Sequence, residues 1–370
     1  MIIRIEDLKE ISQTILAAVD SNELSVLTET LELVLENNVL YMNVTNREYY
    51  AQVKLQVSDE DSFHATVNAN LFLKLVSQIT TDTVEFKVQD NILIVKGNGT
   101  YKIPLIFDGD ELLKLPKIDI NNVTSEFYID SSVLNSIYQF NSKQLNMGVA
   151  SKPVQKMYYV DDKGAITFTS GACVNKFTLE KPIKVLFNFR LVKLFKLFKN
   201  GNVKFTLGYD NISDNIIQTK VRFETSNITI SSVLSCDDSM INSVPVTAIR
   251  SRADSVYPYS VTINKNILFE TINRLMLFTS SKLSAYCKFK FNSDNVVLSD
   301  LTEDNKESIA YNNDTTNIEE SYAATLDLND LKGVLDSCSG QFINIKFGDK
   351  QAFVIQTSNI SFVVPELTDV

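Results

Sequence analysis

Hydrophobic and polar residues alternate along this chain in an order that occurs three times. Each copy opens with an amphipathic stretch in which apolar residues recur every three or four positions, the pattern of a helix with one buried face. The three stretches begin at Ile5, Asp130 and Asn264. We expect an amphipathic helix of several turns at each place.

Two short runs of alternating apolar and polar residues follow each of these helices. The polar turns between the runs fall at Asn37-Asn38, at 162–164 and at 293–295. A period of two on both sides of a turn rich in Asn, Asp and Gly is typical of a β-hairpin. Each copy continues with a second, shorter helix and ends with two more strands.

The second helices open at Asn68, Asn188 and Asp327, residue types that cap the free N–H groups of a first helical turn. In every copy roughly sixty residues separate the two helix starts, and such constant spacing indicates a tandem repeat. We predict three domains, 1–122, 123–257 and 258–370, joined by aperiodic, Pro-containing segments at 107–122 and 243–259. Each is an α+β domain of antiparallel strands with two helices on one face.

Composition places the chain among globular proteins, since 44% of its 370 residues are hydrophobic. No stretch approaches the roughly 18 apolar residues of a membrane span, and the N-terminus lacks the order of a signal peptide. We expect a cytoplasmic protein with no membrane partner. Cys173, Cys236, Cys287 and Cys338 lie far apart without a CxxC pair, which favours reduced, packed thiols.

Catalytic chemistry has little support. His64 is the sole histidine, which excludes a histidine-rich metal site or a triad within one chain, and we interpret it as a surface residue at a strand end. The acidic clusters at 59–61, 108–111 and 237–238 have the character of charged loops. Gly97 and Gly99 lie in a strand connection without the Lys-Ser/Thr of a P-loop. We expect no enzyme activity, no metal and no cofactor.

One basic segment stands out in a chain of formal net charge −10. On a helical wheel, residues 188–201 gather their apolar side chains on one arc and their cations on the opposite one. The apolar arc comprises Leu191, Leu194, Phe195 and Phe198, and the basic arc comprises Arg190, Lys193, Lys196 and Lys199. Taken alone, this pattern also fits the solvated face of an ordinary surface helix.

The whole chain resembles the bacterial sliding clamp, the β subunit of the replicative DNA polymerase. The resemblance rests on the threefold repeat, the length and the order of segments such as "VNANLFLKLVSQI", "YKIPLIFDGDELLKLP", "ITFTSGACVNKF" and "ISFVVPEL". A bacteriophage origin would account for the divergence from the family pattern. The competing hypothesis is a repeated-domain structural or adhesive protein, such as a phage tail component, although such modules are usually all-β.

The resemblance implies a ring in which two head-to-tail chains place sheets outside and helices around a central bore for duplex DNA. DNA would be held without sequence preference by Arg190, Lys193, Lys196 and Lys199. Weaker candidates are Lys9, Lys74, Lys143, Lys265, Arg274 and Lys332, and the lysines of the first domain are equally explained as solvated surface cations. The first helix also carries Glu6, Asp7 and Glu10, so the bore would be basic mainly in the middle domain.

The resemblance also implies two protein contacts. Leu277 and Phe278 would lie at the seam of the homodimer, unless both pack into the core of their own domain. Polymerase and clamp loader would insert short peptides into a cleft between the second and third domains. Its residues would be Val154, Thr169, Gly171, Ala172, Cys173, Val174, Pro245, Ile249, Phe362, Val364 and Pro365. Ala172-Cys173 replaces a usual His-Arg, and Glu366 a common Met, so the preferred peptide should differ.

Overall fold

Side-chain caps fix helix starts in the computed structural model of the chain. Asn68, Asn188 and Asp327 each accept a hydrogen bond from a backbone N–H two or three residues further on, at 2.9, 2.8 and 2.8 Å. These bonds satisfy donors that have no partner within the helix. The expected starts of the three second helices are therefore confirmed. The structure describes residues 1–20, 25–58, 62–145, 150–213, 216–234, 236–279, 285–313, 318, 321–348 and 351–366.

The chain divides into two units. Unit 1 comprises Met1–Leu134 and Lys193–Ser235, and unit 2 comprises Asn135–Val192 and Cys236–Val370. Each unit thus joins one outer repeat to part of the middle repeat, a division that the repeat pattern did not indicate.

Unit 1 is built on an eight-stranded antiparallel sheet that draws strands from two repeats. Its strands, in spatial order, are β11 (Asn122–Asp130), β16 (Asn202–Ser213), β17 (Ile216–Glu224), β18 (Ile228–Val233), β4 (Tyr49–Gln56), β3 (Val39–Asn46), β2 (Thr30–Glu36) and β5 (Phe63–Asn68). The two repeats meet where β18 pairs with β4.

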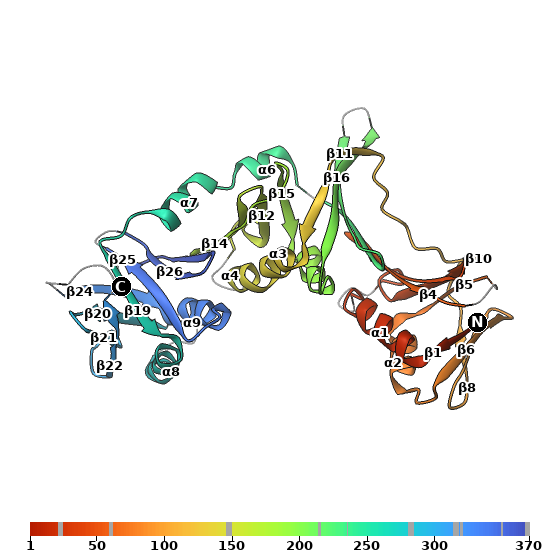
Figure 1. Cartoon of the computed structure of the whole chain (residues 1–370), viewed down its shortest axis with the longest axis horizontal. Helices are drawn as coiled ribbons and strands as arrows, with labels where there is room; N and C mark the ends of the chain where they lie inside the picture. Colours follow the sequence, from red (N-terminus) through yellow and green to blue (C-terminus); the bar gives the residue numbers. More distant parts are fainter. Residues whose placement is uncertain are drawn as a thin grey trace. The chain divides into compact units, whose positions relative to one another are not determined.

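A second sheet of unit 1 has the order β1 (Ile2–Arg4), β6 (Thr83–Gln89), β7 (Ile92–Lys96) and β8 (Thr100–Pro104). The short strands β9 (Phe107–Asp108) and β10 (Glu111–Leu112) form a separate ribbon. The helices α1 (Ile5–Leu16) and α2 (Ala69–Gln78) lie side by side, as Figure 1 shows. Leu8, Ile15 and Phe72 bury the apolar faces of these two helices.

Unit 2 repeats this plan with a nine-stranded sheet. Its strands, in spatial order, are β15 (Lys184–Asn188), β12 (Met157–Asp161), β13 (Gly164–Phe168), β14 (Ala172–Lys176), β27 (Ile360–Val364), β26 (Phe353–Thr357), β25 (Phe342–Phe347), β19 (Tyr259–Asn264) and β23 (Asn312–Asn313). Here the middle and last repeats meet where β14 pairs with β27.

The remaining strands of unit 2 form a four-stranded sheet in the order β22 (Lys306–Ala310), β21 (Asn295–Ser299), β20 (Tyr286–Phe291) and β24 (Tyr322–Asp327). The helices α8 (Lys265–Leu275) and α9 (Leu328–Ser337) pack against each other. Short turns of unit 2 include α4 (Ser142–Leu145), α6 (Asp238–Asn242), the 3₁₀ turns η2 (Pro153–Lys156) and η4 (Met276–Phe278), and the π turn η1 (Ile137–Asn141).

Backbone geometry explains the first predicted hairpin turn. Asn37 and Asn38 have φ values of 51° and 61°, so both residues of the β2–β3 turn are left-handed. Asn tolerates this region better than most residues, and two such residues give the turn twist that suits a two-residue hairpin. The predicted turns at 162–164 and 293–295 likewise join β12 to β13 and β20 to β21.

Two predictions about helices need correction. The helix expected from Asp130 is broken into α3 (Ser131–Ser136), the π turn η1 and α4. At the end of the π turn, Thr167 Oγ1 donates to the Asn141 carbonyl at 3.4 Å. The segment 243–259, expected to be irregular, contains α7 (Val246–Asp254).

The four cysteines are free thiols. Burial raises the pKa of Cys287 to about 12 and that of Cys338 to about 11, so both stay protonated at neutral pH. Within the described residues, no helix has the length and apolar character needed to cross a bilayer.

Candidate functional site

The basic segment differs in shape from the single helix that the sequence predicts. An α-helical turn, α5 (Phe189–Lys193), passes directly into a 3₁₀ turn, η3 (Leu194–Leu197), and Lys199 lies beyond both. The chain leaves the helical conformation at Phe198, where φ is −84° and ψ is 88°. The prediction of a continuous helix over 188–201 is therefore wrong, whereas its division into two faces is confirmed.

Lys193, Lys196 and Lys199 are exposed side chains of unit 1. Among the described residues they have no hydrogen-bond or ion-pair partner. The residues between them are buried, and the rings of Phe195 and Phe198 lie 4.9 and 6.3 Å from that of Phe223. The aromatic contacts hold the backbone that carries these three exposed cations. We call Lys193, Lys196 and Lys199 together the lysine row.

The other predicted DNA-binding residues have varied surroundings. Arg190 is half-buried and belongs to unit 2. Lys74 is exposed on α2 and Lys9 is half-buried on α1, the helix that also carries Glu6, Asp7 and Glu10. The side chain of Lys143 lies outside the described part of the structure.

Three candidate cations in unit 2 already have partners. Arg274 forms a two-pronged ion pair with Glu307, with distances of 2.8 and 2.7 Å. Lys265 Nζ donates to the Cys338 carbonyl at 2.9 Å, and Lys332 Nζ lies 5.5 Å from the ring centre of Phe269. Because the charge of Arg274 is balanced by a carboxylate, it adds little positive potential to its surface.

Leu277 and Phe278 are on the surface of unit 2. Leu277 is 79% exposed and Phe278 is 58% exposed, both in the 3₁₀ turn η4 that follows α8. They do not fill the core of their own domain, which was the alternative to a place at the seam. Adjacent exposed apolar side chains of this size are typical of a surface that another protein covers.

Six of the residues predicted to form the peptide cleft line one pocket of unit 2, of about 190 Å³. They are Thr169, Gly171, Ala172, Pro245, Ile249 and Pro365. Val154 and Val174 are buried in the apolar cluster that continues the floor of this pocket. We call this hollow the β14–α7 pocket, after the strand and the helix that supply its floor.

The prediction is wrong for Cys173, Phe362 and Val364. These side chains are buried in the large core on the other face of the sheet, and Val363 lines the pocket in their place. Successive side chains of a strand point to opposite faces, so an error of one position moves a residue from the pocket to the core. The sequence alone could not choose the face, since residues 362–364 are all apolar.

The helix α7, which the sequence pattern did not predict, contributes Ile249 and Arg252 to the lining of the pocket. Arg250 donates to both carboxylate oxygens of Asp161 at 2.8 and 2.6 Å, and Lys176 forms an ion pair with Asp254. Only Ile249 and Ala253 bury apolar side chains on this helix. Ion pairs to distant strands therefore replace the apolar stripe that would have revealed α7 in the sequence.

The electrostatics of Asp161 follow from this contact. Burial acts to raise its pKa, but hydrogen bonds from Arg250 and the Lys163 backbone, together with the charge of Arg250, outweigh burial and lower the pKa. The carboxylate thus stays ionised and holds α7 against the turn between β12 and β13.

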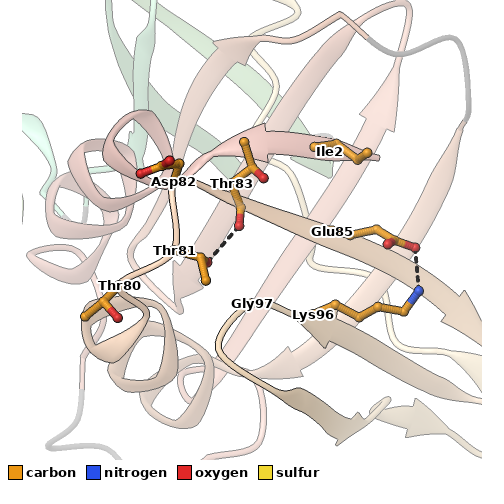
Figure 2. A pocket seen from close by; sticks show the side chains of 8 residues that line it. All are labelled: Ile2, Thr80, Thr81, Asp82, Thr83, Glu85, Lys96 and Gly97. Carbon is orange, nitrogen blue, oxygen red and sulfur yellow. Dashed lines mark hydrogen bonds and ion pairs between the residues drawn. The ribbon is translucent and has the colours of Figure 1, made fainter.

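A larger hollow in unit 1 has a different character. Figure 2 shows this space of about 660 Å³ between the start of β6 and the end of β7. Its walls are mostly polar, and its cation Lys96 is paired with Glu85 at 2.8 Å. A hollow with mostly polar walls lacks the apolar floor that peptide anchors require, so its larger volume does not make it the peptide site.

The single histidine has a structural partner. His64, near the start of β5, is half-buried with Nε2 at 2.9 Å from Glu32 Oε1, which corrects the expectation of a simple surface residue. Among the described residues, no group of three or more His, Cys, Asp or Glu is placed to hold a metal ion. The acidic cluster 59–61 lies outside the described residues, and Asp237 caps α6.

Comparison with known proteins gives partial matches by sequence. No protein-family model matches the chain. It is 24% identical over 126 residues to the β sliding clamp of Mycoplasmopsis pulmonis and 22% identical over 174 residues to that of Helicobacter pylori. The aligned parts cover 33% and 41% of this chain, and 31% and 46% of the two relatives. The sequence match therefore spans less than half of either curated relative.

Solved structures extend the similarity to the whole chain. A Pseudomonas aeruginosa DnaN sliding clamp bound to griselimycin matches with a TM-score of 0.81 at 13% identity, covering 100% of this chain and 99% of that chain. The fold is that of the bacterial β sliding clamp. The resemblance drawn from the repeats and the α+β fold class are thereby confirmed.

A second similar clamp structure contains a bound peptide. The Helicobacter pylori β clamp bound to a DNA ligase peptide matches with a TM-score of 0.75 at 17% identity, with 100% and 99% coverage. At such identities a clamp fold is retained through its pattern of buried positions rather than through particular side chains. The roles of individual residues in this clamp-like chain therefore depend on their own surroundings.

Proposed function

We propose that two copies of this chain close into a ring that encircles duplex DNA and tethers a replicative DNA polymerase as a processivity factor. Each chain would supply three clamp domains, 1–122, 123–257 and 258–370. The observation that carries the proposal is the clamp fold over the entire chain. The function needs no catalytic group, and it places the protein in the cytoplasm with the chromosome.

Ring closure is supported by two sheet edges that are open in the described part of the chain. β8 ends the four-stranded sheet of unit 1 and β22 ends that of unit 2, and among the described residues each pairs with one neighbouring strand. An open edge offers backbone donors and acceptors to a strand of another chain. β22 packs against α8, the helix that leads to the exposed pair Leu277 and Phe278. Pairing of β8 with β22 of a second copy would extend the sheets and cover this apolar pair.

DNA contact is supported by the lysine row. Ammonium groups without carboxylate partners attract phosphates irrespective of base sequence. The net charge of −10 is compatible with this role, because repulsion by the remaining surface opposes non-specific binding elsewhere. Loose contacts of this kind hold a duplex while allowing it to slide.

Client binding is supported by the β14–α7 pocket, whose apolar floor and few polar rim groups suit a short peptide. Polymerase and clamp loader would present such peptides. The competing hypothesis, a repeated-domain structural protein without a DNA role, predicts neither peptide binding nor DNA retention.

The test of the ring is topological. Protein loaded by a clamp loader onto nicked circular DNA should survive gel filtration in high salt, because a closed ring leaves only by opening or at a DNA end. Cutting the circle with a restriction enzyme should release it. Equal retention on circular and linear DNA would contradict encirclement and favour ordinary contact binding.

A further inference from the structure

We propose that the β14–α7 pocket selects peptides in which an apolar anchor is flanked by a carboxylate that pairs with Arg252. This inference rests on the proposed client role and adds the chemistry that the client must present. It makes Arg252 a specificity-determining residue of this chain.

Arg252 is the one charged side chain among the described residues that line the pocket. It is exposed, in the last turn of α7, and no carboxylate among the described residues pairs with it. The neighbouring cations differ, because Arg250 is neutralised by Asp161 and Lys176 by Asp254. One guanidinium therefore remains available at the rim.

The backbone that carries Arg252 is held in place. The Tyr257 hydroxyl donates to the Arg252 carbonyl at 2.7 Å, and the ion pairs of Arg250 and Asp254 attach α7 to the sheet on either side of it. A fixed backbone lowers the entropy lost when the side chain engages a partner. A planar guanidinium also suits two-pronged binding of a carboxylate.

Ser170 also lines the pocket, but it offers a hydrogen-bond acceptor where Arg252 offers donors. Its hydroxyl donates to Asp330 Oδ2 at 3.1 Å, so the hydrogen is already used and the oxygen is left as an acceptor. A ligand would therefore donate an N–H to Ser170 and offer an anion to Arg252. One side of the pocket thus binds a hydrogen-bond donor of the peptide and the other side binds an anion, which fixes the direction of the bound peptide.

The floor between these groups decides the class of partner. Ala172, Ile249 and Val363 present apolar surface in a hollow of about 190 Å³, which suits a large apolar side chain. A nucleic acid backbone would satisfy Arg252 but leave this surface wet, whereas a peptide with an apolar anchor covers both. We therefore infer an acidic peptide rather than DNA.

The experiment measures binding of short fluorescein-labelled peptides by fluorescence polarisation. Each peptide carries a Leu-Phe pair as its apolar anchor. One variable residue, Asp, Asn or Lys, stands directly before or directly after this pair. In one of the two placements, wild type should bind the Asp peptide about threefold more tightly than the Asn peptide at low salt, with Lys weakest. The preference should fade in high salt.

Substitutions assign the preference to one residue. Arg252→Gln should abolish it, and Arg252→Glu should reverse it in favour of the Lys peptide. Lys184→Gln is the matched control, because Lys184 is an exposed cation of the same unit outside the pocket, and its loss should leave the preference intact. Ala352→Phe, at a half-buried lining position, should block all the peptides.

The outcomes separate this inference from the proposed function. Peptides that are blocked by Ala352→Phe but bind without a charge preference would overturn the inference and leave the client pocket standing. Peptides that bind Ala352→Phe as well as wild type would overturn the pocket itself. If Arg252→Gln weakens retention on circular DNA and leaves the peptide preference unchanged, Arg252 serves DNA and the inference is wrong.

Discussion

At the scale of single residues, the contact between Arg250 and Asp161 shows how a charged pair can position a functional wall. Asp161 has only 7% of its side chain exposed, so its charge depends on the guanidinium that faces it. Breaking such a pair costs more than the pair itself contributes, because it leaves an uncompensated buried charge.

This contact gives a pH-dependent prediction. Replacement of Arg250 by Met should lower the free energy of unfolding by about 3 kcal/mol at neutral pH. The folded pKa of Asp161 is lowered in wild type, so the stability from its charge is present above the unfolded pKa and is lost as pH falls through the folded pKa. In Arg250→Met, only the hydrogen bonds from the Lys163 backbone and the Tyr159 hydroxyl still oppose the effect of burial, so the pKa of Asp161 rises and the deficit should shrink towards pH 4.

Urea denaturation of both proteins at pH 7 and pH 4 measures the effect. The double variant Arg250→Met with Asp161→Leu is the control, because it removes the buried charge and should recover much of the stability. A deficit of equal size at both pH values would show that α7 is held by something other than this ion pair.

At the scale of elements, the lysine row depends on the change of backbone conformation along residues 188–201. Lys193 ends α5, Lys196 lies in the 3₁₀ turn η3, and Lys199 follows both turns. Phe195 and Phe198, between these lysines, pack on Phe223 of β17. This packing turns the apolar side chains inward and leaves the three cations exposed.

Reversal of this row tests its contact with DNA. Changing Lys193, Lys196 and Lys199 together to Glu should weaken DNA binding and reduce the salt dependence by up to about three counterions. Binding to a duplex, measured over a range of salt concentrations, gives the slope. Lys87, Lys114 and Lys117 are exposed lysines of the same unit, so their triple change to Glu is matched in charge and should leave the slope intact. If the lysine row is only solvated and does not contact DNA, wild type and both triple variants would show the same dependence of binding on salt concentration.

At the scale of the whole molecule, closure depends on surfaces that are incomplete in one chain. The outer edges of β8 and β22, which are open among the described residues, and the exposed side chains of Leu277 and Phe278 are unfavourable on the surface of a single chain. A head-to-tail dimer related by a twofold axis would cover both kinds of surface at two identical seams.

The seam prediction concerns mass. Leu277→Ala with Phe278→Lys should convert a dimer of about twice 41.7 kDa into a folded monomer, because both side chains are already exposed and their loss does not open the core. Size exclusion with light scattering gives the mass, and circular dichroism checks the fold. Val256→Lys, at an apolar position 91% exposed, should remain a dimer. A double variant that stays dimeric would place the seam elsewhere.

The sequence by itself determined the features that depend on neighbours in the chain. The threefold repeat, the caps at Asn68, Asn188 and Asp327, the Asn37-Asn38 turn and the two faces of residues 188–201 all express local periods and local hydrogen bonds. Each cap, turn or period lies within a few residues of the element that it produces, so the sequence alone is enough to predict that element.

Only the tertiary structure decided which distant strands pair and which face each strand turns inward. The pairing of β4 with β18 and of β14 with β27 joins different repeats, and it sends Val363 to the pocket but Val364 to the core. The tertiary structure also brings Glu307 to Arg274 and Asp161 to Arg250. The first contact neutralises a predicted DNA-binding residue, and the second attaches α7, a helix that the sequence did not predict. The physical reason is that strand register and ion pairing are set by contacts between residues far apart in the chain. A run of apolar residues or a single cation does not specify which distant residue it will contact.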